Sequence, residues 1–105
     1  MSEDRPVKIL GVCGSLRQGS HSLQVLKIAL AAAELEGAEI TLFDPAQQPL
    51  PFCYAQATEE QERNMGKWRE LVKNSDGMIL ATPEYHGSVS GVLKNALDLV
   101  GFDMS

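Results

Sequence analysis

Two polar loops contain the residues of this chain whose types and spacing could support chemistry. The first spans residues 14–22, where serines, two glycines and an arginine follow an apolar stretch. Arg17 offers a permanently charged fork for phosphate oxygens, and the serine hydroxyls offer further donors. Two interpretations are about equally supported by this loop alone: a phosphate cradle at a helix start, or a turn that only caps the helix. The candidate phosphate-binding residues are Ser15, Arg17, Ser20 and Ser22.

Two better-known nucleotide motifs do not fit the first loop. Residues 14–21 have the glycine spacing of a P-loop, but no lysine stands at the position that the motif requires. Hydrolysis of a nucleoside triphosphate is therefore disfavoured. The Gly-x-Gly-x-x-Gly fingerprint of Rossmann dinucleotide sites is absent from the sequence, which disfavours a dinucleotide bound in that manner.

The second loop follows another apolar stretch and is richer in polar and aromatic groups than a simple turn requires. Tyr85 or His86 could lie against a flat ring, and Ser88 could donate to a ring or sugar oxygen. The alternative is a surface loop with a solvated histidine, since no second ligand stands at metal-binding spacing from His86. Together the two loops suggest one phosphorylated aromatic cofactor. The candidate ring-contacting residues are Pro83, Glu84, Tyr85, His86, Gly87 and Ser88.

Alternating strands and helices are predicted to position these loops. Short apolar stretches predict strands over residues 7–13, 38–43 and 78–82. Apolar spacing of three and four predicts helices that start near residue 22, after a capping box at Thr58, and near residue 89. Gly37 is expected to end the first helix, and Asp44-Pro45 to end the second strand. This alternation predicts an α/β domain with an open parallel sheet in the strand order 2-1-3. Both loops then leave the carboxyl edge of the sheet, side by side at its switch point.

Composition limits the partners and the compartment. The 105 residues suffice for one small domain, and the formal net charge of -5 without a basic run argues against nucleic acid or an anionic membrane surface. No apolar run approaches the roughly 18 residues of a membrane span. Cys13 is expected to be a buried apolar filler and Cys53 a surface thiol. Two cysteines that do not form a CxxC pair, together with the lack of a signal peptide, predict a cytoplasmic protein.

The two loops, with residues 91–98 (Gly-Val-Leu-Lys-Asn-Ala-Leu-Asp), resemble the NADPH-dependent FMN reductase family. That family comprises flavin, quinone, chromate and azo-dye reductases with a flavodoxin-like fold. The resemblance implies a non-covalent FMN, with its phosphate on the first loop and its isoalloxazine ring along the second. It also implies that FMN takes hydride from NADPH or NADH and passes electrons to a small-molecule acceptor, so no catalytic side chain is expected. Many relatives have asparagine where Ser22 stands.

The resemblance also bears on the extent of the chain. The family sheet has the order 2-1-3-4-5, so we expect the single domain of residues 1–105 to be truncated at its carboxyl end and to lack the last strands. It implies a homodimer or homotetramer, and the open edge of the third strand favours pairing as well. Residues 49–54 are expected to border the acceptor pocket or the flavin of a neighbouring subunit. Two alternatives stay open: a flavodoxin-type FMN electron carrier, and an inactive fragment or interaction module.

Overall fold

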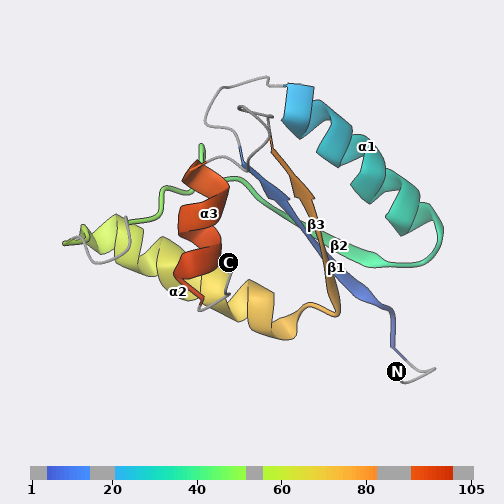
Figure 1. Cartoon of the computed structure of the whole chain (residues 1–105). Helices are drawn as coiled ribbons and strands as arrows, with labels where there is room; N and C mark the ends of the chain where they lie inside the picture. The colour runs from blue at the N-terminus through green and yellow to red at the C-terminus, as the bar shows by residue number, and fades with distance from the viewer. Residues whose placement is uncertain (1–4, 15–20, 52–55, 83–90, 101–105) are drawn as a thin grey trace.

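A central parallel sheet with helices on both faces forms the fold (Figure 1). The computed structural model describes residues 5–14, 21–51, 56–82 and 91–100. Strands and helices alternate along the chain, which confirms the predicted α/β class. The elements are β1 (Lys8–Cys13), α1 (His21–Leu35), β2 (Glu39–Phe43), α2 (Glu59–Asn74), β3 (Gly77–Ala81) and α3 (Gly91–Asp98).

The sheet has the order β2-β1-β3, and both strand pairs are parallel, as predicted. Lys8 lies opposite Glu39 on one side of β1, and Ile9 lies opposite Gly77 on the other. β3 occupies residues 77–81 and not the predicted 78–82. The shift has a local cause, because the Asp76 N–H donates to the Lys8 carbonyl at 2.8 Å and starts the pairing one residue early.

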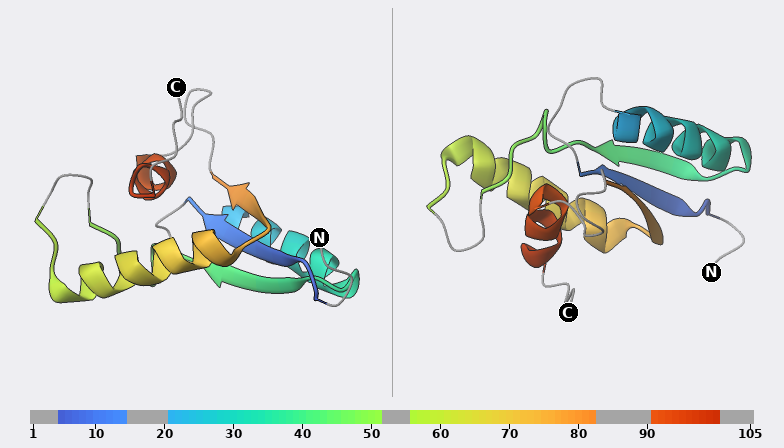
Figure 2. Two further views of the ribbon diagram at one scale, coloured as in Figure 1. Left: turned by 90° about the horizontal axis from the view of Figure 1, so that it is seen from below. Right: turned by 45° about the horizontal axis from the view of Figure 1, so that its top comes forward.

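Helix α1 covers one face of the sheet, where Leu26 and Leu30 pack against Cys13 (Figure 2). The close seating of α1 depends on Gly11, because a Cβ there would lie 2.6 Å from Leu30 Cδ1. Cys13 is buried, as the sequence predicted. The absence of a side chain at Gly11 thus lets α1 lie close to β1.

The end of α1 forms at the glycine that the sequence singled out. Gly37 has a φ of 96°, a left-handed conformation that costs glycine little. Its N–H donates to the Glu34 carbonyl at 3.0 Å, and the Ala38 N–H donates to the Ala33 carbonyl at 3.1 Å. These two bonds make a Schellman motif, which satisfies carbonyls that the last turn of a helix leaves open.

Helices α2 and α3 cover the opposite face (Figure 2). Trp68 of α2 is fully buried, and its ring centroid lies 4.8 Å from that of Phe43 at the end of β2. The Trp68 Nε1–H donates to the Ala96 carbonyl at 2.7 Å, and Arg69 Nε donates to the Leu99 carbonyl at 3.1 Å. Side chains of α2 therefore satisfy carbonyls at the end of α3 and fix the two helices together.

The predicted capping box opens α2. Thr58 Oγ1 accepts from the Gln61 N–H at 3.1 Å, and Gln61 Oε1 accepts from the Thr58 N–H at 2.9 Å. Three glutamates stand in the first turn and Lys73 in the last, which matches the polarity of the helix dipole.

Candidate functional site

The ends of β1 and β3 meet at the carboxyl edge of the sheet. The Gly14 N–H donates to the Ala81 carbonyl at 2.7 Å, so the chain leaves both strands at one place. Figure 1 shows the start of α1 at the same end of the molecule as the ends of these two strands. The described residues that flank the two predicted loops are thus brought together, as the strand order implied.

Ser22 is the one candidate residue that lies within the described part of the chain. It is half-buried in the first turn of α1, beside an exposed His21. The other nine candidate residues lie outside the described residues and remain predictions. These are Ser15, Arg17, Ser20, Pro83, Glu84, Tyr85, His86, Gly87 and Ser88.

The first turn of α1 has the electrostatics that an anion requires. It contains no acidic residue, although the chain as a whole carries more acids than bases. The first turn of α2, by contrast, contains Glu59, Glu60 and Glu62. The amino end of a helix carries about half a positive charge, which carboxylates in the first turn would offset. The start of α1 therefore fits a phosphate group, whereas the start of α2 does not.

An open apolar groove of about 410 Å³ runs between α1 and β3. The polar residues of its lining are His21 and Ser22, at the end of the first predicted loop, and Thr82, directly before the second. Val25 and Leu80 add exposed apolar surface, at 57% and 42% of their full areas. The groove offers a hydrophobic wall beside the edge at which the two loops begin.

The segment after β2 continues from the carboxyl end of that strand to α2 and α3, and sequence reasoning missed the bonds that hold it. Asp44 turns the chain, because its Oδ1 accepts from the Ala46 N–H at 3.0 Å. Farther along, Asn95 Nδ2 donates to the Pro51 carbonyl at 2.9 Å. The Asp44-Pro45 pair signalled the end of the strand, but nothing in the sequence pointed to the contact between Asn95 and Pro51.

The opposite, amino edge of the sheet is held by charge. Both terminal guanidinium nitrogens of Arg5 donate to Asp76, at 2.9 and 3.0 Å, and the Lys8 N–H donates to the same carboxylate at 2.8 Å. The hydrogen bond from Arg5, with that from Lys8, lowers the pKa of Asp76 from 3.8 to about 2. The same contact raises the pKa of Arg5. This cluster joins Arg5, three residues before β1, to the turn before β3.

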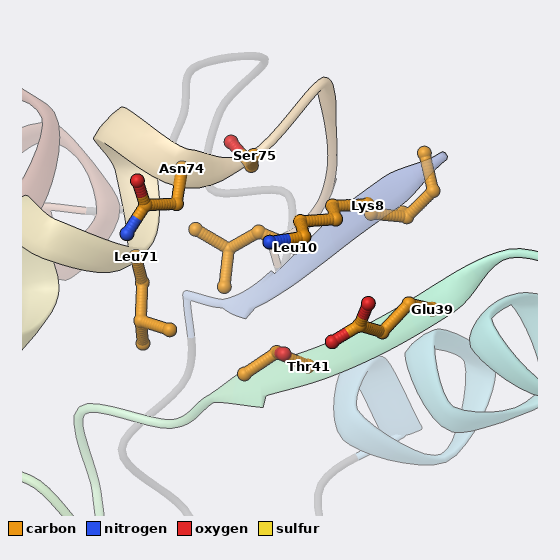
Figure 3. Close-up of a pocket in the computed structure, with 8 residues that line it drawn as sticks. Lys8, Leu10, Glu39, Thr41, Leu71, Asn74 and Ser75 are labelled. Atoms are coloured by element: carbon orange, nitrogen blue, oxygen red, sulfur yellow. The ribbon is translucent and has the colours of Figure 1, made fainter. Parts of the chain in front are cut away.

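A second cavity, of about 170 Å³, opens at this amino edge (Figure 3). Open parallel sheets bind ligands beyond the carboxyl ends of their strands, so its place disfavours it as the cofactor site. No group of three or more potential metal ligands occurs among the described residues. No described helix combines the length and hydropathy needed to cross a bilayer. The polar residues around the cavity are Lys8, Glu39, Thr41, Asn74 and Ser75.

Comparison with known proteins agrees with the resemblance found in the sequence. The profile of the NADPH-dependent FMN reductase family matches residues 7–105. The FMN-dependent NADPH-azoreductase of Staphylococcus haemolyticus (strain JCSC1435) is 34% identical over 101 residues, which cover 92% of this chain and 54% of the relative. The chain thus spans about half the length of the curated relatives that it matches.

Solved structures show the same fold. An azoreductase from Bacillus anthracis str. Sterne superposes with a TM-score of 0.65 at 15% identity, over 93% of this chain and 57% of its own. The flavoenzyme FerB of Paracoccus denitrificans, an NAD(P)H:(acceptor) oxidoreductase, gives a TM-score of 0.63 at 25% identity, over 93% and 52%. The described sheet therefore has a flavodoxin-like fold.

Proposed function

Because the chain belongs to the NADPH-dependent FMN reductase family, we propose that it binds FMN at the carboxyl edge of its sheet and acts in NADPH-dependent reduction. The observation that carries the proposal is the 2.7 Å bond from the Gly14 N–H to the Ala81 carbonyl. This bond joins the two strand ends from which the family-like loops continue. A phosphate held by one loop and a ring held by the other would then belong to one molecule.

The proposal assigns the two loops different tasks. Ser15, Arg17, Ser20 and Ser22 would hold the phosphate, helped by the acid-free first turn of α1. The second loop would lie along the isoalloxazine ring, where its backbone and polar side chains orient the ring and limit access of water. When bound, FMN supplies hydride acceptance from NADPH and onward transfer of electrons. The ring-contacting residues are Pro83, Glu84, Tyr85, His86, Gly87 and Ser88.

The finer points of the function follow from the same assignment. The electron acceptor would be a small molecule, such as a flavin, a quinone, an azo dye or a metal oxyanion, and NADH could replace NADPH. Support for the azo dye comes from the names of the relatives, which are FMN-dependent NADPH-azoreductases. We further propose that residues 1–105 belong to a single domain and that the protein is a cytoplasmic homodimer or homotetramer.

Titration with FMN tests the proposal. Flavin fluorescence should be quenched by the purified chain and less strongly by Arg17→Gln. Hydrogen bonds to charged groups contribute about 1.5–3 kcal/mol, so the dissociation constant should rise about 10- to 100-fold. Arg63→Gln, at an exposed position of α2, removes the same charge and should change the constant by less than about twofold. No quenching by the wild type, or equal effects of the two variants, would contradict the assignment.

A further inference from the structure

Two asparagine side chains hold one short segment of backbone between β2 and α2. Asn64 Nδ2 donates to the Pro49 carbonyl and Asn95 Nδ2 donates to the Pro51 carbonyl, both at 2.9 Å. Proline has no N–H, so its carbonyl is its one backbone hydrogen-bonding group. Pro51 is buried, and loss of the partner would leave its carbonyl with a desolvation cost.

The two asparagines differ in what they connect. Asn64 lies on α2 and makes its bond at an exposed position. Asn95 lies on α3 and makes a partly buried bond between residues 44 positions apart. Since α3 begins at Gly91, Asn95 stands about one helical turn beyond the loop assigned to the flavin ring.

Helix α3 is a firm base for such a contact. The next residue after Asn95 is Ala96, whose carbonyl accepts from the buried Trp68 at 2.7 Å. Arg69 holds the Leu99 carbonyl at 3.1 Å, so α2 fixes the end of α3. A displacement of Pro51 relative to this helix would therefore require that the Asn95 bond break.

We propose that Asn95 is a positioning residue, which fixes the distance between Pro51 and the start of α3 and so orients the ring-binding side of the FMN site. The inference rests on the proposed function. The hydrogen bond has a fixed direction, because the Asn95 amide donates and the Pro51 carbonyl can only accept. An aspartate at position 95 has the same shape but would present a carboxylate oxygen to the carbonyl.

The matched variants Asn95→Asp and Asn64→Asp separate positioning from general stability. Each variant removes the amide donor of one proline carbonyl, and the two prolines, Pro49 and Pro51, lie two residues apart in the same segment. We expect N95D to weaken FMN binding about three- to tenfold, and N64D by less than about twofold. Thermal unfolding midpoints of the FMN-free proteins, and amide exchange of residues 44–48 and 91–98, should be recorded for both. N95D is expected to raise exchange in both segments.

Each outcome of this comparison has a distinct meaning. Weaker FMN binding and faster exchange in N95D, with N64D close to the wild type, would support the positioning role. FMN binding by N95D equal to that of the wild type would overturn it, as would equal losses in both variants that follow their unfolding midpoints. Absence of FMN binding in the wild type would overturn the proposed function itself, and the role of Asn95 toward FMN with it.

Discussion

The two ends of the same sheet are held together by different chemistry. At the amino end, Arg5 and Asp76 form an ion pair at 2.9 Å, and the Asp76 carboxylate also accepts a hydrogen bond from the Lys8 N–H. At the carboxyl end, the Gly14 N–H donates to the Ala81 carbonyl, Asn95 donates to the Pro51 carbonyl, and the Asp44 carboxylate accepts from the Ala46 N–H. The ion pair at the amino end is therefore complete within the chain. Among the described residues, no ion pair joins the strands at the carboxyl end, so the charge of a phosphate is left to be met by the ligand-binding loop.

The largest effect is expected at Trp68, which lies in the core between the sheet, α2 and α3. Trp68 is fully buried and packs on Phe43, so Trp68→Ala should lower the free energy of unfolding by about 3–5 kcal/mol. Trp68→Phe keeps most of the apolar volume but leaves the Ala96 carbonyl without its indole donor, at a cost of about 1–3 kcal/mol. Urea denaturation measures both. A loss below about 1 kcal/mol for Trp68→Ala would contradict this packing.

A smaller effect is expected where α1 meets β1. Gly11→Ala places a Cβ 2.6 Å from Leu30 Cδ1, so the leucine must move inside a packed face. Overpacking of this kind costs about 1–3 kcal/mol.

Gly77→Ala is the matched control at the amino end of β3, where the new Cβ would meet Ile9 Cδ1 at 3.4 Å. Its free energy of unfolding should stay within about 1 kcal/mol of the wild type. Equal losses at the two glycines, measured in urea, would show that α1 does not depend on Gly11 for its seat.

The ion pair at the amino end of the sheet should make the stability of the folded chain depend on pH. The folded pKa of Asp76 is about 2 and its ordinary value is 3.8. A lowered pKa means that the ionised carboxylate stabilises the folded chain above pH 3.8, and that this contribution is lost as the pH falls toward about 2. Both partners are partly exposed, so solvent screens the pair and the effect is modest.

Asp76→Asn removes the titrating group. Between pH 3.8 and about 2, the thermal unfolding midpoint of the wild type should therefore fall more steeply than that of the variant. Added salt should narrow the difference between them at neutral pH. Parallel midpoint curves over this pH range would mean that the Arg5 contact does not hold in solution.

The smallest effect is expected at the cavity of the amino edge. Lys8→Met and Glu39→Gln change two of its polar residues without touching the carboxyl edge. The dissociation constant for FMN should stay within about twofold of the wild-type value in both variants. A tenfold increase of this constant in either variant would indicate that the ligand binds at the amino end of the strands, and would contradict the assignment of the site to the carboxyl end.

Local patterns were sufficient to predict most of the fold. Gly37 ends α1 through its left-handed backbone, and Thr58 and Gln61 form the capping box that their spacing implied. Alternation and right-handed crossovers predicted the parallel sheet, and the order 2-1-3 places α1 and α2 on opposite faces of it. β1 and β2 begin one residue later than predicted, at Lys8 and Glu39. β3 is shifted by one residue in the other direction, because the Asp76–Lys8 backbone bond sets the first pair there.

The contacts that tie the candidate site together could not be predicted in the same way. The Asn95–Pro51 bond spans 44 residues and the Trp68–Ala96 bond spans 28. Both acceptors are backbone carbonyls, which every residue type carries, so the sequence holds no sign of the partner. Asn95 was visible as part of a family-like stretch, but its acceptor became evident only when α3 was placed beside the segment after β2.

The visible absorption spectrum of the purified chain with FMN, before and after NADPH is added without oxygen, tests the central claim most directly. FMN should stay with the chain through gel filtration, its absorption should bleach with NADPH, and an azo dye or quinone should restore it. FMN that separates from the chain would contradict a flavin site at the carboxyl edge. Bound FMN that NADPH leaves oxidised would contradict the reductase assignment and favour an electron carrier.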